Sequence, residues 1–324
     1  MSITRRLALV LAAASLASPA FAQSGTSQPL TIIVPFAPGG PTDVSARIIA
    51  SHMAMTLKRS VLIENVAGAG GATGANRARL ATPDGNTILV GNLGAMASNV
   101  ALTPDLPYDP VQDFEPIGMI NMAPMVVVAK PQLGLADLAA FRARLKEKGE
   151  AMSYGSGGQG STSHLACLFL ESELGARATH VPYRGTAPAL NDVMSGAIDF
   201  LCDQATILVP QVQAGSVKAL VVSSSKRMKA LPDVPSATEA GVPAYQMSGW
   251  NALFAPKGTP PRMIEAYRKA LVAALQDEMV MSRFDEVAAE IPAPELTTGP
   301  GLRNFVVTEI SRWKEVVRKA GIRP

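Results

Sequence analysis

The sequence predicts an α/β protein in which short strands of an open, largely parallel sheet alternate with helices. Apolar runs rich in β-branched residues are separated by helical patterns along most of the chain. Turns rich in glycine and hydroxyl residues stand where strands end and helices begin. The chain has 324 residues, and about 300 remain after a leader, a length typical of two domains.

The first half of the chain contains four expected strands, at 30–36, 61–65, 87–91 and 125–129. A helix follows the first strand, with Thr42 or Asp43 as its N-cap, and continues through Leu57. A surface helix at 135–148 is closed by Gly149.

The second half continues the alternation. We expect a helix at 163–174, a strand at 178–183, a helix ending at 195, a strand at 198–202, a helix ending near 214 and a strand at 217–223. Asp203 directly follows the strand at 198–202. From Pro261 the chain is helical, with a break near 292–300 marked by proline and glycine.

The N-terminus has the order of a cleaved export signal. Arg5 and Arg6 precede an apolar run at 7–16, and Ala20-Phe21-Ala22 follows. We expect residues 1–22 to be removed after Ala22 and the mature protein to be periplasmic. Because the rest of a twin-arginine motif is missing, Sec export is favoured, and the twin-arginine route stays open. No later stretch is apolar enough for a membrane helix.

Composition argues against several classes of partner. The charged fraction is 17%, without a basic run or a basic amphipathic helix, so nucleic acid is not an expected partner. His52, His164 and His180 lie far apart, and no metal or other cofactor is expected. Cys167 and Cys202 form either a disulfide or two buried thiols, and in an oxidising compartment we predict the disulfide.

A glycine-rich turn at 155–163 is the strongest candidate binding element. From Gly155 it has the G-x-x-x-x-G-S-T spacing of a phosphate-binding loop, except that Ser161 replaces the lysine. Backbone N–H groups, the hydroxyls of Ser161, Thr162 and Ser163, and a helix N-terminus suit a carboxylate better than a triphosphate. The alternative is a simple helix cap in a flexible loop.

A second glycine turn lies at 37–43, after the first strand. Ligands in open α/β sheets bind at the carboxyl ends of strands, so this turn, the turns at 155–163 and 184–186, and Asp203 are expected to face one cleft. A third glycine cluster at 68–74 has threonine at position 73 and does not complete a dinucleotide-binding fingerprint.

A serine hydrolase is the rival interpretation. Ser161 or Ser163, with His164 or His180 and Asp199 or Asp203, supplies the residue types of a catalytic triad. However, no G-x-S-x-G turn occurs, and adjacent residues on one helix do not face each other. We therefore expect a binding protein and no enzymatic activity.

Six groups of motifs together resemble the Bug family of periplasmic solute receptors for tripartite tricarboxylate transporters. They are Val34-Pro-Phe-Ala-Pro-Gly-Gly-Pro-Thr-Asp43, Glu64-Asn65 with Gly68-Ala-Gly-Gly71, Pro83-Asp84-Gly85, Leu106-Pro-Tyr-Asp-Pro110 with Asp113-Phe114, His180-Val-Pro-Tyr-Arg-Gly185, and Leu231-Pro-Asp-Val-Pro235 with Glu239-Ala-Gly241. The resemblance extends from about residue 30 to the segment 313–322.

The resemblance implies a type II periplasmic binding protein, with two α/β lobes that close on a ligand by hinge motion. Lobe one would comprise 23–127 and 248–324, and lobe two 128–247. The implied ligand-binding residues are Ala37, Pro38, Gly39, Gly40, Thr42 and Asp43 in lobe one, and Ser156, Gly157, Gly158, Gly160, Ser161, Thr162, Ser163, Arg184, Gly185, Thr186 and Asp203 in lobe two. Cys202-Asp203-Gln204 departs from the aromatic–aspartate–asparagine pattern of many members.

The expected ligand is a small organic carboxylate. With Arg184 as cation and Asp203 as anion, the candidate site suits a mono- or dicarboxylate more easily than citrate. Tyr183 and Trp250 are candidate walls for an aromatic ring, so aliphatic and aromatic acids both stay open. The expected partners are the transporter membrane subunits, with a sensor kinase as the alternative, and we expect a monomer.

Overall fold

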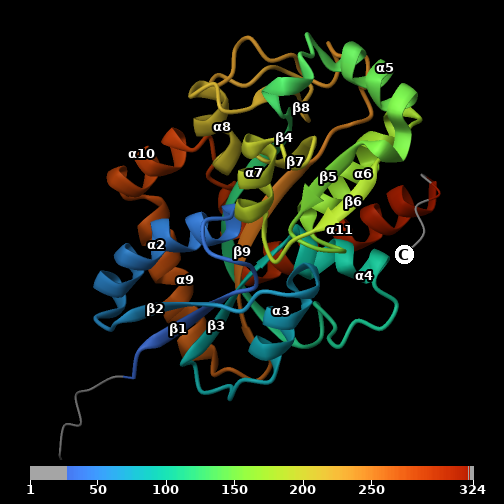
Figure 1. The fold of residues 1–324 in the computed structure, drawn as a ribbon. Coiled ribbons are helices and arrows are strands. Elements are labelled where there is room, and N and C mark those ends of the chain that lie inside the picture. Colours follow the sequence, from blue (N-terminus) through green and yellow to red (C-terminus); the bar gives the residue numbers. More distant parts are fainter. Residues whose placement is uncertain (1–27, 320, 322–324) are drawn as a thin grey trace, which may run out of the picture.

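The computed structural model describes residues 28–319 and 321, so the expected signal segment 1–22 and its cleavage site lie outside the described residues. Strands and helices alternate through the first half of the chain (Figure 1). The elements there are β1 (Leu30–Val34), α2 (Pro41–Leu57), β2 (Val61–Asn65), α3 (Ala72–Arg79), β3 (Thr87–Asn92), α4 (Asn99–Leu102) and β4 (Phe114–Ala129).

The alternation continues through the second half and ends in three helices. The elements are α5 (Leu138–Lys148), β5 (Ser153–Ser156), α6 (Thr162–Leu174), β6 (Thr179–Pro182), α7 (Thr186–Ser195), β7 (Phe200–Gln204), α8 (Ala205–Gln213), β8 (Lys218–Val222), β9 (Ser248–Pro256), α9 (Pro261–Leu275), α10 (Glu278–Glu286) and α11 (Gly299–Lys319). The predicted α/β class is confirmed. In the part of the chain described, no helix is both long and apolar enough to span a bilayer.

The strands follow the order β2-β1-β3-β9-β4-β7-β5-β6, with β8 paired to β4. β1 is parallel to β2 and β3, and β5 is parallel to β6 and β7. β4 and β9 run antiparallel to every strand they pair with. The sheet is therefore mixed, and the expectation of a largely parallel sheet holds for each outer part but not for its centre.

β4 joins the two lobes. Its first part, Phe114 to Pro124, pairs with β9, and its second part, Met125 to Ala129, pairs with β7 and β8 (Figure 1). We propose that the lobe boundary in β4 lies at this change of partner, close to the expected boundary at 127/128. The other expected boundary, at 247/248, coincides with the start of β9.

The central strands are where the sequence prediction is least complete. The strand expected at 125–129 is only the end of the 16-residue β4, and β9 is not predicted as a strand. β9 contains Gly249 and Asn251, residues that usually mark turns. Every β9 residue after Ser248 is buried, so tertiary packing outweighs its weak strand propensity.

Apolar side chains from both lobes form one continuous core beneath α11. Trp313 of α11 is fully buried, and Phe169 of α6 contacts its ring edge-to-face. Trp250 is also fully buried and donates from Nε1 to Glu309 at 3.2 Å. This tryptophan therefore belongs to the core and does not form a pocket wall. Separate cores cover the opposite face, beneath α2 and α9 in one lobe and α7 and α8 in the other.

In the structure a disulfide joins Cys167 of α6 to Cys202 of β7. Their Cα atoms are 5.4 Å apart, and both residues are fully buried. The bond ties the helix that follows the second glycine turn to the strand that carries Asp203.

Candidate ligand-binding site

The two glycine turns predicted from sequence meet at the junction of the lobes. The Ala37 N–H donates to the carbonyl oxygen of Arg184 at 3.0 Å, and the Gly94 N–H donates to the hydroxyl of Thr162 at 2.9 Å. Each bond joins a residue from the first third of the chain to one in the segment 162–184. The turns are therefore held against each other in this conformation.

Glycine is required at this junction because backbones of the two lobes approach closely. Gly70 has φ of +59°, and a Cβ there would collide with the carbonyl oxygen of Gln159 in the other lobe. Gly160 has φ of +80°, and a Cβ there would collide with the Asn99 side chain. Larger residues at either position would force the lobes apart.

The first turn leads from β1 into α2, whose N-cap is Gly40. The prediction of Thr42 or Asp43 as N-cap is wrong because Pro41 occupies the first helical position, where its fixed φ and missing N–H fit well. Asp43 therefore lies within the first turn of the helix. From there its Oδ2 reaches back and accepts a hydrogen bond from the Gly39 N–H at 2.9 Å.

Asp43 holds the first turn together by a charged network. Arg47 Nε donates to its Oδ2 at 2.8 Å, and Asn65 Nδ2 donates to its Oδ1 at 2.9 Å. Burial raises the pKa of Asp43, but hydrogen bonds from Arg47, Gly39 and Asn65 outweigh burial and hold that pKa below its ordinary value. This carboxylate is ionised, and both of its oxygens accept hydrogen bonds from protein groups.

The second turn leads from β5 into α6 and presents hydroxyl groups. Ser161 is the N-cap of α6, and its Oγ accepts from the His164 N–H at 3.3 Å. Ser163 Oγ accepts from the Gly157 N–H at 2.9 Å and lies 3.2 Å from Ser161 Oγ. Both hydroxyls retain hydrogen-bonding capacity toward the cleft.

Two neutral histidines are hydrogen bonded to residues of this turn. His164 Nδ1 accepts from the Gly160 N–H at 3.1 Å, so its proton lies on Nε2. His180 Nε2 lies 2.6 Å from Ser156 Oγ, and the two imidazole rings stack with centroids 4.1 Å apart. Burial lowers the pKa of His180 to about 4; burial and the neighbouring His180 lower that of His164 to about 3.

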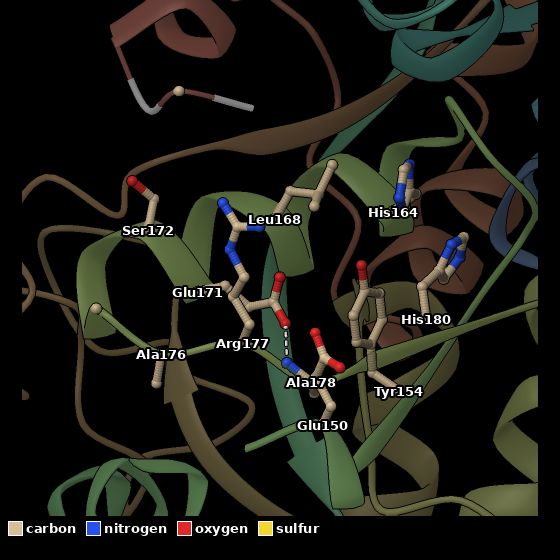
Figure 2. Close-up of a pocket in the computed structure, with 12 residues that line it drawn as sticks. Glu150, Tyr154, His164, Leu168, Glu171, Ser172, Ala176, Arg177, Ala178 and His180 are labelled. Atoms are coloured by element: carbon tan, nitrogen blue, oxygen red, sulfur yellow. Dashed lines mark hydrogen bonds between the residues drawn. The ribbon is translucent and has the colours of Figure 1, made fainter. Parts of the chain in front are cut away.

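These histidines line a cavity of about 850 Å³, which also contacts Leu168 and Glu171 of α6 (Figure 2). Figure 2 shows Tyr154 beside them and Glu171 farther along α6, where its carboxylate accepts from the Ala178 N–H at 2.6 Å. Burial raises the pKa of Glu171 to about 7. Of the predicted ligand-binding residues, none lines this cavity.

A smaller cavity, of about 20 Å³, lies between the lobes. Eight predicted residues line it: Gly40, Thr42, Gly157, Ser161, Thr162, Ser163, Thr186 and Asp203. This volume accepts about one water molecule, so a carboxylic acid requires the lobes to separate before it enters.

Nine predicted residues lie outside this lining: Ala37, Pro38, Gly39, Asp43, Ser156, Gly158, Gly160, Arg184 and Gly185. The Arg184 side chain is exposed, and this residue contacts the other lobe through its carbonyl oxygen. Tyr183, a candidate aromatic wall, donates its hydroxyl to Asp192 at 2.6 Å and is likewise absent from the lining.

The cavity has four lining residues that sequence reasoning missed: Phe36, Pro41, Asn92 and Gln204. Asn92 ends β3; its Nδ2 donates to Thr42 Oγ1 at 3.0 Å, and its Oδ1 accepts from the Ala95 N–H. The signal was available, because Asn92 directly follows a predicted strand, where ligand-binding residues gather. Phe36 is the aromatic side chain at this cavity.

Asp203, in β7, is 1% exposed. Its Oδ1 accepts from the Gln204 N–H at 2.7 Å, and its Oδ2 is buried without a hydrogen-bond partner among the described residues. Burial raises the pKa of Asp203 to about 7. No group of three or more His, Cys, Asp or Glu residues in the described ranges is placed to hold a metal.

Residues 45–322 match the family described as "Tripartite tricarboxylate transporter family receptor". The chain is 34% identical over 325 residues to Protein BugT of Bordetella pertussis, covering 99% of each chain. The family match and the match to BugT each cover most of the chain.

Two solved structures share the fold closely. MatC (Rpa3494) from Rhodopseudomonas palustris with bound malate is 41% identical, with a TM-score of 0.87 over 89% of this chain and 98% of that one. The periplasmic binding protein BugD is 35% identical, with a TM-score of 0.88 over 91% and 98% of the two chains.

Proposed function

Because the chain belongs to the tripartite tricarboxylate transporter receptor family, we propose that it captures a small organic carboxylate between its lobes. It then delivers this ligand to the membrane subunits of such a transporter. The observation that carries the proposal is the interlobe cavity, lined by the starts of α2 and α6. Two helix N-termini directed at one small space stabilise negative charge there.

The lining supports a carboxylate bound mainly by neutral donors. Hydroxyl groups come from Thr42, Ser161, Thr162, Ser163 and Thr186, and among residues 28–319 no lysine or arginine lines the cavity. A carboxylate held by hydroxyls, backbone N–H groups and water is bound without a buried ion pair, which suits a receptor that must release its cargo. MatC, which is 41% identical, has malate bound, and malate is a small organic dicarboxylate.

The remaining parts of the proposal follow from the family. We propose that the mature protein acts in the periplasm as a monomer, and that lobe closure around the ligand creates the surface recognised by the membrane subunits. A receptor that reports the ligand to a sensor kinase would use the same cavity. Phe36 in the lining keeps both aliphatic and aromatic acids as candidates.

We further propose that the ligand leaves chemically unchanged. Ser156 and His180 are hydrogen bonded, but Asp199, one of the two candidate acids, pairs with Lys130 Nζ at 2.8 Å and accepts from the Ser153 N–H at 2.7 Å. The other, Asp203, accepts from the Gln204 N–H at 2.7 Å. Ser161 contacts the backbone N–H of His164, not its ring. A serine–histidine–aspartate relay is not assembled from these groups.

A thermal-shift screen of organic acids on the mature protein tests the proposal. A ligand that binds only the folded state adds about 2.7 kcal/mol at 100 times its Kd, so a true ligand raises Tm by several degrees. Product analysis of the same mixtures, together with an ester panel, should show no turnover. Absence of any shift with carboxylates, or turnover lost in Ser156→Ala, would contradict the proposal.

A further inference from the structure

Asp203 is the one charged side chain among the residues that line the interlobe cavity. Thr186 and Ser163, which share the lining, are neutral. The nearest arginines in sequence to the cavity turns, Arg47 and Arg184, lie on its outside, the first paired with Asp43 and the second exposed. A ligand carboxylate placed against Asp203 would therefore bring two like charges together without a cation.

One oxygen of Asp203 has no donor within hydrogen-bond distance in the described part of the chain, although the Thr186 hydroxyl lies close enough to this carboxylate to lower its pKa. Oδ1 is satisfied by the Gln204 N–H, whereas Oδ2 is buried and unpartnered among the described residues. An unsatisfied buried carboxylate oxygen is costly, and native proteins keep such groups where a ligand completes them. A ligand carboxylate offers only acceptors, so a ligand that contacts Oδ2 directly, without an intervening water molecule, has to do so through another group that donates.

The small size of the cavity limits where that donor lies. Ser161, Ser163 and Asp203 line the same space of about 20 Å³. A ligand carboxylate on the hydroxyls of the second turn therefore lies close to Asp203. The donor must be on a carbon near that carboxylate.

Resting on the proposed carboxylate-binding function, we propose that Asp203 determines specificity, selecting carboxylates that carry a hydroxyl or ammonium group next to a carboxylate. The two groups share the required chemistry, which is a hydrogen-bond donor directed at Oδ2. A ligand donor stabilises the ionised form of Asp203. Because burial outweighs the hydrogen bonds from Thr186 and Gln204 and raises the pKa of Asp203 to about 7, binding near neutral pH releases protons.

Calorimetry on the full mature protein, with L-malate, L-aspartate and succinate as probes, tests this selection. At least one of the two donor-bearing acids should bind about tenfold or more tightly than succinate. In Asp203→Asn, whose amide can itself donate to a carboxylate, the preference should fall to about threefold or less. Asp105→Asn, an exposed aspartate outside the lining, is the matched control and should retain the preference.

The outcomes separate this inference from the proposed function. If no carboxylate in the wider screen binds, the proposed function fails. If succinate binds as tightly as malate and aspartate, or if the tightest acid in the screen has no such donor, the function stands and the role of Asp203 is overturned. Proton uptake on binding, measured in buffers of different ionisation enthalpy, would also overturn it, because Asp203 would then be the donor. A preference that persists in Asp203→Asn would assign the selection to another residue.

Discussion

The two glycine turns at the lobe junction share a strand–turn–helix pattern but are stabilised by opposite chemistry. The first is held by an ionised carboxylate, Asp43, bonded to Gly39, Arg47 and Asn65. The second is held from behind by neutral imidazoles and exposes serine hydroxyls toward the cavity. The charge of Asp43 stabilises the first turn itself, whereas the serine hydroxyls of the second turn are available to bind a ligand.

The same contrast separates the two buried aspartates near the cleft. Asp43 has every strong donor it needs, so its pKa is lowered. In Asp203 burial outweighs the hydrogen bonds from Thr186 and Gln204 and raises the pKa to about 7, and Oδ2 has no partner among the described residues. An acid that is already satisfied stabilises the fold, while an acid that is not satisfied marks a place for a ligand.

The largest effect is expected from blocking closure between the turns. Gly70→Ala places a Cβ against the Gln159 carbonyl and should weaken carboxylate binding more than about 100-fold. Gly134→Ala is the control, because Gly134 has φ of +61°, nearly the same as Gly70, with no atom within 4 Å of an added Cβ. Calorimetry and thermal melts on both variants separate the interlobe collision from backbone strain. Equal affinity in the two variants would show that the close approach of Gly70 to Gln159 is not needed for binding.

The next largest effect concerns Thr162. Its hydroxyl accepts from the Gly94 N–H across the lobes and lines the cavity, so Thr162→Ala should weaken binding about tenfold or more. Thr162→Ser retains the hydroxyl and should bind within about threefold of wild type. Isothermal titration measures both. Wild-type affinity in the alanine variant would show that the Thr162 hydroxyl is not an anchor for the ligand.

A pH series compares the two aspartates directly. Asp43→Asn should lower the free energy of unfolding by about 1–2 kcal/mol at neutral pH. The loss should shrink as the pH falls below 3.8, since a lowered pKa means that folding stabilises only the ionised form.

Asp203→Asn should show the opposite pH dependence of the free energy of unfolding. Its raised pKa makes wild-type stability fall as pH rises toward about 7, so the variant should be more stable than wild type near pH 8 and equal to it near pH 4. Chemical denaturation across the pH range measures the free energy of unfolding of both variants. If that free energy, relative to wild type, changes with pH in the same direction in both, the contrast between the two aspartates is wrong.

The smallest effect is expected from Arg184. Its side chain is exposed and its interlobe contact uses the carbonyl oxygen, so Arg184→Met should change affinity by less than about twofold. Titrations at low and high salt test this. A large loss that disappears at high salt would restore the sequence-based expectation that this cation attracts the ligand.

Local sequence signals predicted the turns well because their chemistry is local. Glycine spacing, the serine N-cap of α6 and the strand before each turn are all readable within a few residues. Asp43 was correctly located near the turn, but its role depends on Asn65, 22 residues away, and Arg184 was assigned to the ligand although its side chain is exposed. Side-chain direction at such positions is set by the other lobe.

The missing parts of the prediction are those set by long-range packing. Gly249 and Asn251 give β9 a low strand propensity. Gly249 is nevertheless required, because a Cβ there would collide with the Gln204 side chain. Phe36 and Gln204 line the cavity between the lobes, so their part in it depends on how the two lobes pack together. No local pattern reports that packing.

A crystal structure of the mature protein with its tightest-binding acid tests the central claim most directly. We expect a ligand carboxylate between the lobes, within hydrogen-bond distance of Ser161, Thr162 or Ser163 and of N–H groups in the second turn. A ligand found instead in the cavity beside Glu171 and His180 (Figure 2), or outside the lobe junction altogether, would contradict it.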